Sequence, residues 1–460
     1  MRTNRWMSVA DPIHGIIQFD RDDETHRLLL DVMNTRAFQR LRRLKQMGLA
    51  EFVFPNAVHN RFVHSLGATH LMVLTLQHFR REPETRDLLK NAFADTDIAL
   101  GRLLLLGILT HDIGHGPLSH TLEDILGLKE RGLGHDDYWN AKILREDDEL
   151  GVIWQRYGAQ LPDAVIRLTG EGAHTHFLAS LISSQLDMDR LDYLLRDSHF
   201  LGVRYGQIES QRIIGNLTLA QTPGGQPTLA VREEALPAVE HYLFGRHEAY
   251  KMALHSLDKS SEATLKKTLE RFRWARDRDI AVGPPAQSLY QLMNDPQALS
   301  VPQYLRLDDY GVWDAIHGWS LEADDALLRQ LATRLMKHDI FKFVDLRAYG
   351  LSGPLRETMP AVYDALQAHY VKRGLSMTFG FDELQVRPRP LYLRAPDREP
   401  IWILTQQGAV DLGDASSLPL GADAHRGEKH LAFVWDREAR EFLKRQLQSL
   451  ASPSRASKAE

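Results

Sequence analysis

An apolar run that ends in two histidines and a carboxylate limits this chain's fold more than any other feature. Nearly every residue from Ile98 to Leu109 is apolar, which predicts a helix buried on all sides. The chain continues Thr110-His-Asp-Ile-Gly-His-Gly-Pro117, and its glycines and proline end a helix. Neighbouring side chains in mid-helix diverge by about 100°, so His111 and Asp112 can reach one cation only at a helix end. The alternative is that these groups cap a helix C-terminus, although burying them without a compensating cation is costly.

Composition excludes several classes of protein. The 460 residues suffice for two to four domains at roughly 150 residues each. Lys and Arg total 56 and Asp and Glu total 61, a net charge of −5, so a polyanion must meet a local basic pocket rather than a basic surface. Cysteine is absent, which excludes disulfides, thiolate metal sites and cysteine nucleophiles. The sequence has no apolar leader and no apolar stretch of about 20 residues, so we expect a cytoplasmic protein with no membrane-spanning helix.

Histidines gather in one window of the sequence. Of 21 histidines, eight lie between residues 59 and 135, where an even spread would place about three or four. They are His59, His64, His70, His78, His111, His115, His120 and His135. This window is where we expect the chemistry.

The apolar pattern predicts a mostly α-helical fold. Helical spacing continues from about Glu24 to Ile280, and two alternating stretches around a Pro-Gly-Gly turn predict a β-hairpin insertion at Leu217–Val231. A Gly-Pro-Pro break after Val282 predicts a domain boundary, and short strands at 384–393, 400–405 and 430–435 predict a smaller α+β C-terminal part. We therefore expect a helical core at 1–281, a C-terminal helical and α+β domain at 288–451, and a flexible tail at 452–460.

One imidazole and one carboxylate do not make a tight divalent site, so further ligands are needed. His64 is a candidate, and so is the face formed by Asp189, Tyr193 and Asp197, which recur at helical spacing. The alternatives are an ordinary buried histidine and a solvated helix face.

The order of these residues resembles a known family. The signature H…HD…D of the HD-domain phosphohydrolases is similar to the order found here, which is His64, then His111-Asp112, then Asp189. Longer strings resemble the deoxynucleoside triphosphate triphosphohydrolase (dNTPase) branch, which includes metazoan enzymes with a SAM domain and bacterial enzymes without one. These strings are Asp11-Pro-Ile-His-Gly15, Phe38 to Gln46, Phe54 to Gly67, His111 to His120 and Asp189 to Tyr193. The resemblance covers roughly Val9 to Leu257.

The resemblance implies a metal centre and a hydrolytic reaction. His64, His111, Asp112 and Asp189 would be the metal ligands. Two imidazoles and two carboxylates suit manganese, iron, nickel or zinc better than calcium, with magnesium accompanying the nucleotide. A metal lowers the pKa of bound water to about 7. Water attack on the α-phosphate would release deoxynucleoside and intact triphosphate.

The resemblance also implies groups that complete the reaction. The leaving 5′-oxygen needs a proton, and His115, His120 and His135 are the candidate catalytic histidines. Glu123, which stands where the family usually has aspartate, would orient an imidazole.

Substrate contacts are implied around these catalytic residues. Arg61, Arg190 and Arg246 would bind phosphates, with Arg190 standing where the family commonly has lysine. Gln46, Met47, Tyr193 and Asp197 would line the sugar pocket, and Tyr250 would also contact substrate. Leu254 and Ser256 depart from the family's aromatic and histidine.

A regulatory nucleotide site is implied as well, in altered form. Asn34, Gln39, Arg42, Arg232 and Lys342 are its candidate residues. His338, Asn216 and Glu234 replace an arginine, an aromatic and a lysine of the family. The lost cations argue against activation by GTP plus dNTP of the vertebrate type.

We therefore expect a metal-dependent dNTP triphosphohydrolase that forms a homo-oligomer, a dimer or tetramer, with dNTP as substrate and a possible activating nucleotide. Nucleic acid binding stays open. The alternatives are an HD-type phosphodiesterase or single-strand nuclease, and a non-catalytic nucleotide sensor.

Overall fold

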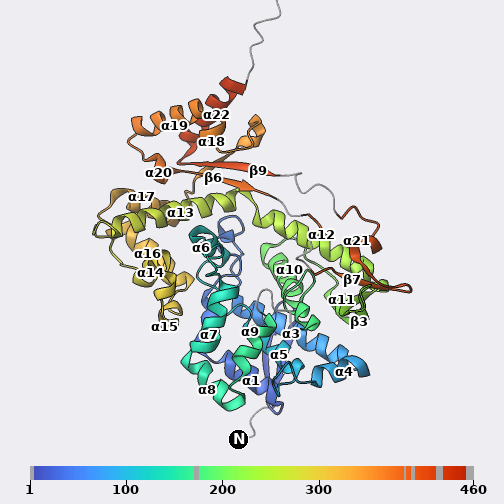
Figure 1. Cartoon of the computed structure of the whole chain (residues 1–460). Helices are drawn as coiled ribbons and strands as arrows, with labels where there is room; N and C mark the ends of the chain where they lie inside the picture. The colour runs from blue at the N-terminus through green and yellow to red at the C-terminus, as the bar shows by residue number, and fades with distance from the viewer. Residues whose placement is uncertain (1–4, 170–175, 388–389, 395–398, 421–427, 452–460) are drawn as a thin grey trace, which may run out of the picture. The chain divides into compact units, whose positions relative to one another are not determined.

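The computed structural model describes residues 5–169, 176–387, 390–394, 399–420 and 428–451 (Figure 1). The described chain is mostly α-helical, and its strands form small sheets of two to four members, which confirms the predicted fold class. The predicted tail at 452–460 lies outside the described residues. Among the described helices, none is both long enough and apolar enough to cross a bilayer.

Contacts divide the chain into two compact units, each assembled from separate segments. The first unit consists of Met1–Ala249, Asn294–Tyr310 and Pro390–Ala422. The second consists of Tyr250–Met293, Gly311–Arg389 and Asp423–Glu460. Each unit is therefore completed by chain that is distant in sequence.

The first unit contains helices, a two-stranded hairpin and a four-stranded sheet. Its helices are α1 (Glu24–Met33), α2 (Arg36–Gln39), α3 (Arg61–Phe79), α4 (Pro83–Lys90), α5 (Leu100–Thr110), α6 (His120–Leu126), α7 (Asn140–Glu146), α8 (Asp148–Tyr157), α9 (Leu161–Thr169), α10 (Met188–Leu201), α11 (Ser210–Gly215), α12 (Leu236–Ala253), α15 (Val301–Tyr304) and α21 (Leu412–Ala415). Short 3-10 turns lie at η1 (Arg40–Arg43), η2 (Ala50–Phe52), η4 (Phe177–Leu181), η5 (Glu233–Ala235) and η6 (Pro296–Ala298), and a π-helical turn, η3, spans His135–Trp139. Its strands are β1 (Trp6–Asp11), β2 (Gly15–Asp20), β3 (Leu217–Gln221), β4 (Pro227–Arg232), β7 (Trp402–Thr405) and β8 (Gly408–Asp411).

The second unit packs helices against a three-stranded sheet. Its helices are α13 (Ser256–Arg276), α14 (Gln287–Asn294), α16 (Asp309–Glu322), α17 (Ala326–Met336), α18 (Leu355–Thr358), α19 (Pro360–Lys372), α20 (Met377–Gly380) and α22 (Arg437–Ala451), with a 3-10 turn, η7, at Leu346–Tyr349. The strands β5 (Lys342–Asp345), β9 (Lys429–Val434) and β6 (Phe381–Val386) pair antiparallel in the order β5-β9-β6.

The predicted hairpin is present but belongs to a larger sheet. β3 and β4 pair antiparallel from Leu217↔Val231 onward. β7 then pairs parallel to β4, and β8 closes the sheet in the order β3-β4-β7-β8. We expected the strand at 400–405 inside one C-terminal part, whereas it completes the sheet of the first unit. The N-terminal hairpin of β1 and β2 was not predicted.

Three helices form the centre of the first unit (Figure 1). α5 is buried along its whole length, as its all-round apolar pattern predicts, and it ends at Thr110. α3 packs against both α5 and α10. The side chains of Asn60 and Asp187 cap α3 and α10 by accepting hydrogen bonds from Val63 N and Arg190 N.

α3 and α10 approach closely at Gly67. A Cβ atom at this position would lie 1.9 Å from Asp192 Oδ1 and 2.3 Å from an Arg196 guanidinium nitrogen. Both of those side chains are fully buried, so neither can move aside into solvent. Only glycine allows the two helices this separation.

We expect Gly67→Ala to lower the free energy of unfolding by about 1–3 kcal/mol, because the added methyl group overpacks a buried charged pair. Gly151→Ala is the matched control: Gly151 also lies in a helix, and a Cβ there would meet nothing within 4 Å. That variant should be neutral or more stable by up to about 1 kcal/mol. Urea unfolding of both variants measures this, and equal effects would contradict the close approach.

Candidate active site

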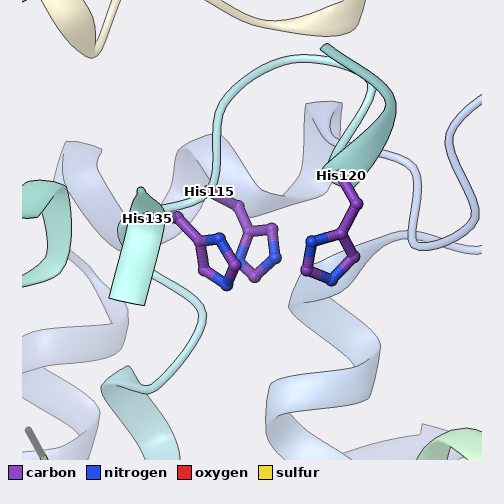
Figure 2. Close-up of side chains that lie close together, drawn as sticks. All are labelled: His115, His120 and His135. Atoms are coloured by element: carbon purple, nitrogen blue, oxygen red, sulfur yellow. The ribbon is translucent and has the colours of Figure 1, made fainter. Parts of the chain in front are cut away.

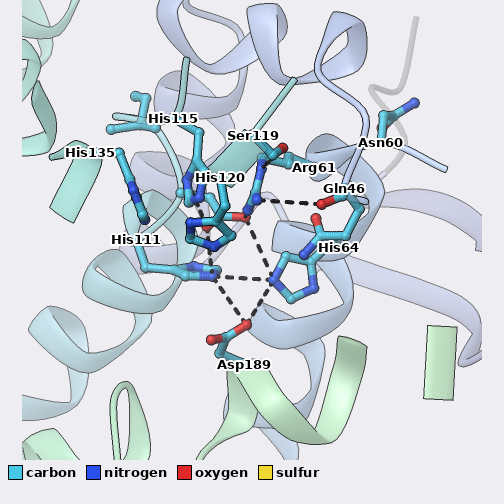
Figure 3. Close-up of polar contacts among 12 residues, drawn as sticks. Gln46, Asn60, Arg61, His64, His111, His115, Ser119, His120, His135 and Asp189 are labelled. Atoms are coloured by element: carbon cyan, nitrogen blue, oxygen red, sulfur yellow. Dashed lines mark hydrogen bonds and ion pairs between the residues drawn. The ribbon is translucent and has the colours of Figure 1, made fainter. Parts of the chain in front are cut away.

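Three of the four predicted metal ligands, His64, His111 and Asp189, converge at one point of the first unit (Figure 3), and the fourth, Asp112, lies beside them. The Nε2 atoms of His64 and His111 lie 3.3 Å apart. Asp189 Oδ1 is 3.0 Å from His64 Nε2 and 3.6 Å from His111 Nε2. The Asp112 oxygens lie 3.7 Å and 3.5 Å from the same two nitrogens.

Hydrogen bonds fix which nitrogen each ligand histidine presents. His111 Nδ1 lies 2.6 Å from the carbonyl oxygen of Ile108, which can only accept, so Nδ1 carries the proton. His64 Nδ1 donates in the same way to Asp192 Oδ2 at 2.8 Å. Both rings therefore turn Nε2 toward the shared point, with the outer hydrogen bonds that metal-binding histidines usually have.

The spacing of these atoms fits a bound cation. Ligand atoms about 2.1 Å from a common ion are roughly 3.0–3.4 Å apart in octahedral or tetrahedral coordination, close to the observed 3.0–3.7 Å separations. His64, His111 and Asp189 each offer a ligand atom within a mutual 4.8 Å. This donor set can hold a divalent transition metal.

Electrostatics also favour a positive charge at this point. Burial lowers the pKa of His64, yet hydrogen bonds to Asp189 and Asp192 dominate and raise it to about 10. Burial likewise opposes ionised His111, while Asp112 and Asp189 raise its pKa. The carboxylates therefore favour a positive charge on or between these two rings.

The turn after α5 is held by backbone contacts. Asn140 Nδ2 donates to the carbonyl oxygens of Thr110 and His111, at 2.9 and 2.8 Å. A Cβ atom at Gly114 would lie 2.3 Å from the carbonyl oxygen of His135. The glycine that we expected only to end the helix therefore also lets the π-helical turn approach.

Two residues that the sequence analysis missed support the same turn. The buried guanidinium of Arg40 donates to the carbonyl oxygens of Ile113 and His115, at 3.2 and 2.5 Å. Tyr304, from the segment Asn294–Tyr310 of the first unit, donates to the carbonyl oxygen of Gly114 at 2.7 Å. Nothing local in the sequence marks these partners, because they come from elsewhere in the chain.

Asp309 is a third missed residue. Its two carboxylate oxygens accept from the amides of Leu118 and Lys45, at 2.7 and 2.8 Å, and burial raises its pKa to about 6. Leu118 and Ser119 both adopt left-handed φ angles, +57° and +53°. Such angles are unfavourable for side-chain-bearing residues, so Asp309 helps to hold a strained turn beside the site.

The three predicted catalytic histidines form a second cluster (Figure 2). The ring centroids of His115 and His135 lie 3.4 Å apart, and that of His120 lies 5.1 and 5.0 Å from them. Glu123 accepts from Nδ1 of His135 at 2.9 Å and of His120 at 3.2 Å. Burial opposes its charge, but these imidazoles lower the pKa of Glu123, so it is ionised.

The members of this cluster differ in exposure and charge. His115 is buried, and burial together with the Arg61 charge lowers its pKa well below the usual value, so its ring is neutral at pH 7. His120 exposes 63% of its side chain. His120 is therefore the member of the cluster that a molecule arriving from solvent reaches directly.

Arg61 pairs with one of the predicted metal ligands. Its guanidinium donates to Asp112 Oδ2 at 2.7 Å and to Ser119 Oγ at 2.8 Å. Burial alone would raise the pKa of Asp112, but the Arg61 charge holds it well below its usual range. The predicted phosphate-binding arginine thus also keeps a predicted metal ligand ionised.

The predicted sugar-pocket residues have varied surroundings. Gln46 Oε1 is buried and has no hydrogen-bond partner among the described residues. Met47 packs with Ala50, Ala57 and Leu201. Asp197 is not on a solvated helix face, because it is 9% exposed and accepts from His59 Nε2 at 2.6 Å.

The remaining predicted substrate residues contact other parts of the chain. Arg190 donates to Ser184 O at 2.7 Å and also to the hydroxyl of Tyr193 at 3.3 Å. Arg246 is buried and donates to the carbonyl oxygen of Gln185 at 3.0 Å. Tyr250 lies in the part of α12 that belongs to the second unit. Their contact with a substrate stays a prediction.

Three predicted regulatory residues line one cavity of about 410 Å³: Asn34, Gln39 and Arg42. The same cavity is lined by Met7 of β1 and by two further arginines, Arg21 and Arg27. The other two predicted residues lie elsewhere: Arg232 pairs with Glu82 at 3.0 Å, and Lys342 belongs to the second unit.

Several known proteins are similar to this chain. No protein-family model matches the chain. The uncharacterized protein YwfO of Bacillus subtilis is 29% identical over 406 residues, which cover 87% of this chain and 85% of YwfO. The deoxynucleoside triphosphate triphosphohydrolase SAMHD1 of Gallus gallus is 25% identical over 368 residues, and that of Mus musculus is 30% identical over 222 residues.

The chain is a homologue of these dNTP triphosphohydrolases. The matches cover 73% and 42% of this chain, but only 55% and 32% of the two vertebrate enzymes, respectively. This chain is also similar to the crystal structure of a phosphohydrolase from Bacteroides thetaiotaomicron, with a TM-score of 0.73 and 26% identity. The match covers 93% of this chain and 99% of the other. Together these comparisons support a metal-dependent phosphohydrolase.

Metal affinity should depend on pH, because the cation must displace protons from the ligand histidines. The pKa of metal-free His64 is raised to about 10, so one proton must leave His64 throughout the range from pH 6 to pH 8. Lowering the pH from 8 to 6 should therefore weaken Mn²⁺ binding by about 100-fold, or more if His111 also releases a proton. Titration of metal-free protein with Mn²⁺, followed by the electron paramagnetic resonance signal of the free ion, measures this. An affinity that does not change with pH would contradict the ligand assignment.

Proposed function

We propose that this protein is a metal-dependent dNTP triphosphohydrolase that converts a dNTP into deoxynucleoside and inorganic triphosphate. The observation that carries the proposal is the convergence of His64, His111, Asp112 and Asp189, with both Nε2 atoms turned to one point, beside a separate histidine cluster backed by Glu123. A metal centre with proton-carrying groups next to it suits phosphoester hydrolysis without a side-chain nucleophile.

In this proposal the residues divide the work of one hydrolytic step. A divalent cation, manganese, iron, nickel or zinc, would supply Lewis acidity and lower the pKa of water when bound. The oxygen of a water molecule forms the new bond to the α-phosphorus, and the bond from that phosphorus to the 5′-oxygen breaks. His120 and His135 would carry the proton that the 5′-oxygen takes up, and Glu123, which contacts both rings, would orient them.

Substrate binding uses the charges around this centre. Arg61 is close enough to the ligands to bind a phosphate oxygen while it remains paired with Asp112. Gln46 Oε1, which has no partner in the described part of the chain, would accept from a sugar hydroxyl. The cavity lined by Arg21, Arg27 and Arg42 would take a second, regulatory nucleotide in a homo-oligomer.

The decisive experiment identifies the products. Protein loaded with Mn²⁺ is incubated with each dNTP and NTP, with and without a second nucleotide, in water enriched in ¹⁸O. We expect deoxynucleoside and tripolyphosphate, with the label in the tripolyphosphate. Nucleoside monophosphate with pyrophosphate, or cleavage of a single-stranded oligonucleotide, would favour the phosphodiesterase or nuclease alternative, and no turnover would favour the sensor.

Asp189→Ala should lose metal and turnover together, because it removes a ligand oxygen and leaves the two imidazoles with one carboxylate. We expect metal affinity to fall at least about 100-fold. Asp148→Ala is the matched control, since Asp148 is also an acidic residue in the first turn of a helix but is exposed. Metal content by mass spectrometry and dNTP turnover are compared, and a fully active Asp189→Ala would refute the assignment.

Glu123→Gln should separate proton transfer from metal binding. The amide keeps the size of the side chain but removes the charge that both imidazoles contact, so kcat should fall about 10²- to 10⁴-fold while metal content is unchanged. Glu130→Gln, an exposed change in the loop after α6, should leave kcat unchanged. Wild-type kcat in Glu123→Gln would remove this cluster from the mechanism.

A further inference from the structure

The turn of the N-terminal hairpin has no role in the proposed reaction, although it contains one of the strings that are similar to the family. β1 and β2 are joined by Asp11-Pro12-Ile13-His14-Gly15. Asp11 Oδ1 accepts from the amides of Ile13 and His14, both at 2.9 Å, and Gly15 has a φ of +74°. The carboxylate thus fixes the conformation of its own turn.

Two side chains of this turn reach α10. His14 Nε2 lies 2.6 Å from Asp192 Oδ1, and its side chain is only 7% exposed. Asp11 Oδ2 accepts from Arg196 Nη1 at 2.8 Å. Arg196 in turn donates from Nε and Nη2 to the two oxygens of Asp192, at 2.8 and 2.9 Å.

Asp192 is the link between the turn and the metal centre. Its Oδ2 accepts from His64 Nδ1, the hydrogen bond that turns His64 Nε2 toward the other ligands. Burial opposes its charge, but Arg196 holds the pKa of Asp192 well below its usual range, so it is an ionised acceptor for His64. The Asp192 carboxylate therefore contacts His14 through one oxygen and His64 through the other.

Arg196 and His14 approach Asp192 in different ways. Arg196 binds both carboxylate oxygens from the same helix, one turn further along. His14 approaches Oδ1 from a different element, and Gly67 of α3 lies against the same oxygen. The ion pair with Arg196 balances the charge of Asp192. The contact with His14 holds the same carboxylate from a second side.

We propose that the β1–β2 turn is a positioning element of the metal centre: Asp11 and His14 hold Asp192, and Asp192 orients His64. This inference rests on the metal site proposed above. Groups that orient a metal-ligating histidine typically change metal affinity by about 10- to 100-fold when they are removed. The turn therefore sets how tightly the centre holds its cation.

The test measures metal affinity rather than turnover. The full-length protein is stripped of metal by chelation and titrated with Mn²⁺ and, separately, with Co²⁺, whose visible spectrum reports ligand geometry. His14→Ala should weaken Mn²⁺ binding by about 10- to 100-fold and change the Co²⁺ spectrum. His14→Gln should recover most of the affinity, because its amide can donate to Asp192 Oδ1.

Two further variants keep the test decisive. Gln18→Ala changes an exposed residue of the same hairpin whose side chain donates to Ser8, and its affinity should stay within threefold of wild type. Asp11→Asn keeps an acceptor for the turn amides but loses the charge opposite Arg196, and it should weaken binding by about threefold to tenfold. Thermal unfolding of each metal-free variant checks that the fold is intact.

The outcomes separate this inference from the proposed function. A wild-type protein that binds neither ion would contradict the metal site itself. Wild-type binding with an unchanged His14→Ala would overturn only the role of the turn. A loss of affinity in His14→Ala that His14→Gln does not reduce would also overturn it, because the hydrogen bond to Asp192 would then not be the cause.

Discussion

The hydrogen bond from His64 to Asp192 is the contact on which the geometry of the candidate site depends. It needs a fully buried carboxylate on α10 beside a fully buried imidazole on α3, and it exists only because Gly67 lets the two helices approach. A buried carboxylate is tolerated when it is paired and hydrogen-bonded, and removing one partner typically costs about 3–5 kcal/mol. Arg196 provides the pairing, so the orientation of the candidate metal ligand His64 is tied to the packing of the core.

The second constraint is the turn after α5, which must present His111 and Asp112 together. Regular helix geometry cannot do this in mid-helix, so the chain leaves the helix here, and its freed carbonyl oxygens need donors. Asn140 and Arg40 supply those donors from side chains. The segment 294–310 belongs to the first unit as well: Tyr304 donates to the carbonyl oxygen of Gly114, and Asp309 accepts from the amide of Leu118. The ligand geometry thus depends on residues remote in sequence.

This division explains what the sequence could and could not predict. The buried helix α5, its end at Thr110 and the helical face of α10 follow from local periodicity, and the sequence predicted them. The resemblance to the family also implied the four candidate metal ligands, which the structure brings together. Long-range partners left no local pattern: β7 was predicted as a strand, but its pairing with β4, about 170 residues earlier, was not. Asp197 illustrates the same limit, since periodicity left a solvated helix face open as an alternative, whereas its partner His59 lies 138 residues earlier in the chain.

The charges around the centre indicate what it is built to bind. Asp11, Asp112, Asp189 and Asp192 contribute four carboxylates, and Arg61 and Arg196 contribute two cations, so two negative charges remain if the imidazoles are neutral. In the metal-free protein, the neighbouring carboxylates raise the pKa of His64 to about 10 and also raise the pKa of His111, so both rings hold a proton more readily than a free imidazole. A divalent cation supplies the same charge at the same point, and it needs those rings deprotonated. In the proposed reaction, the positive charge that attracts a phosphate would come from this cation and from Arg61, which is itself paired with Asp112.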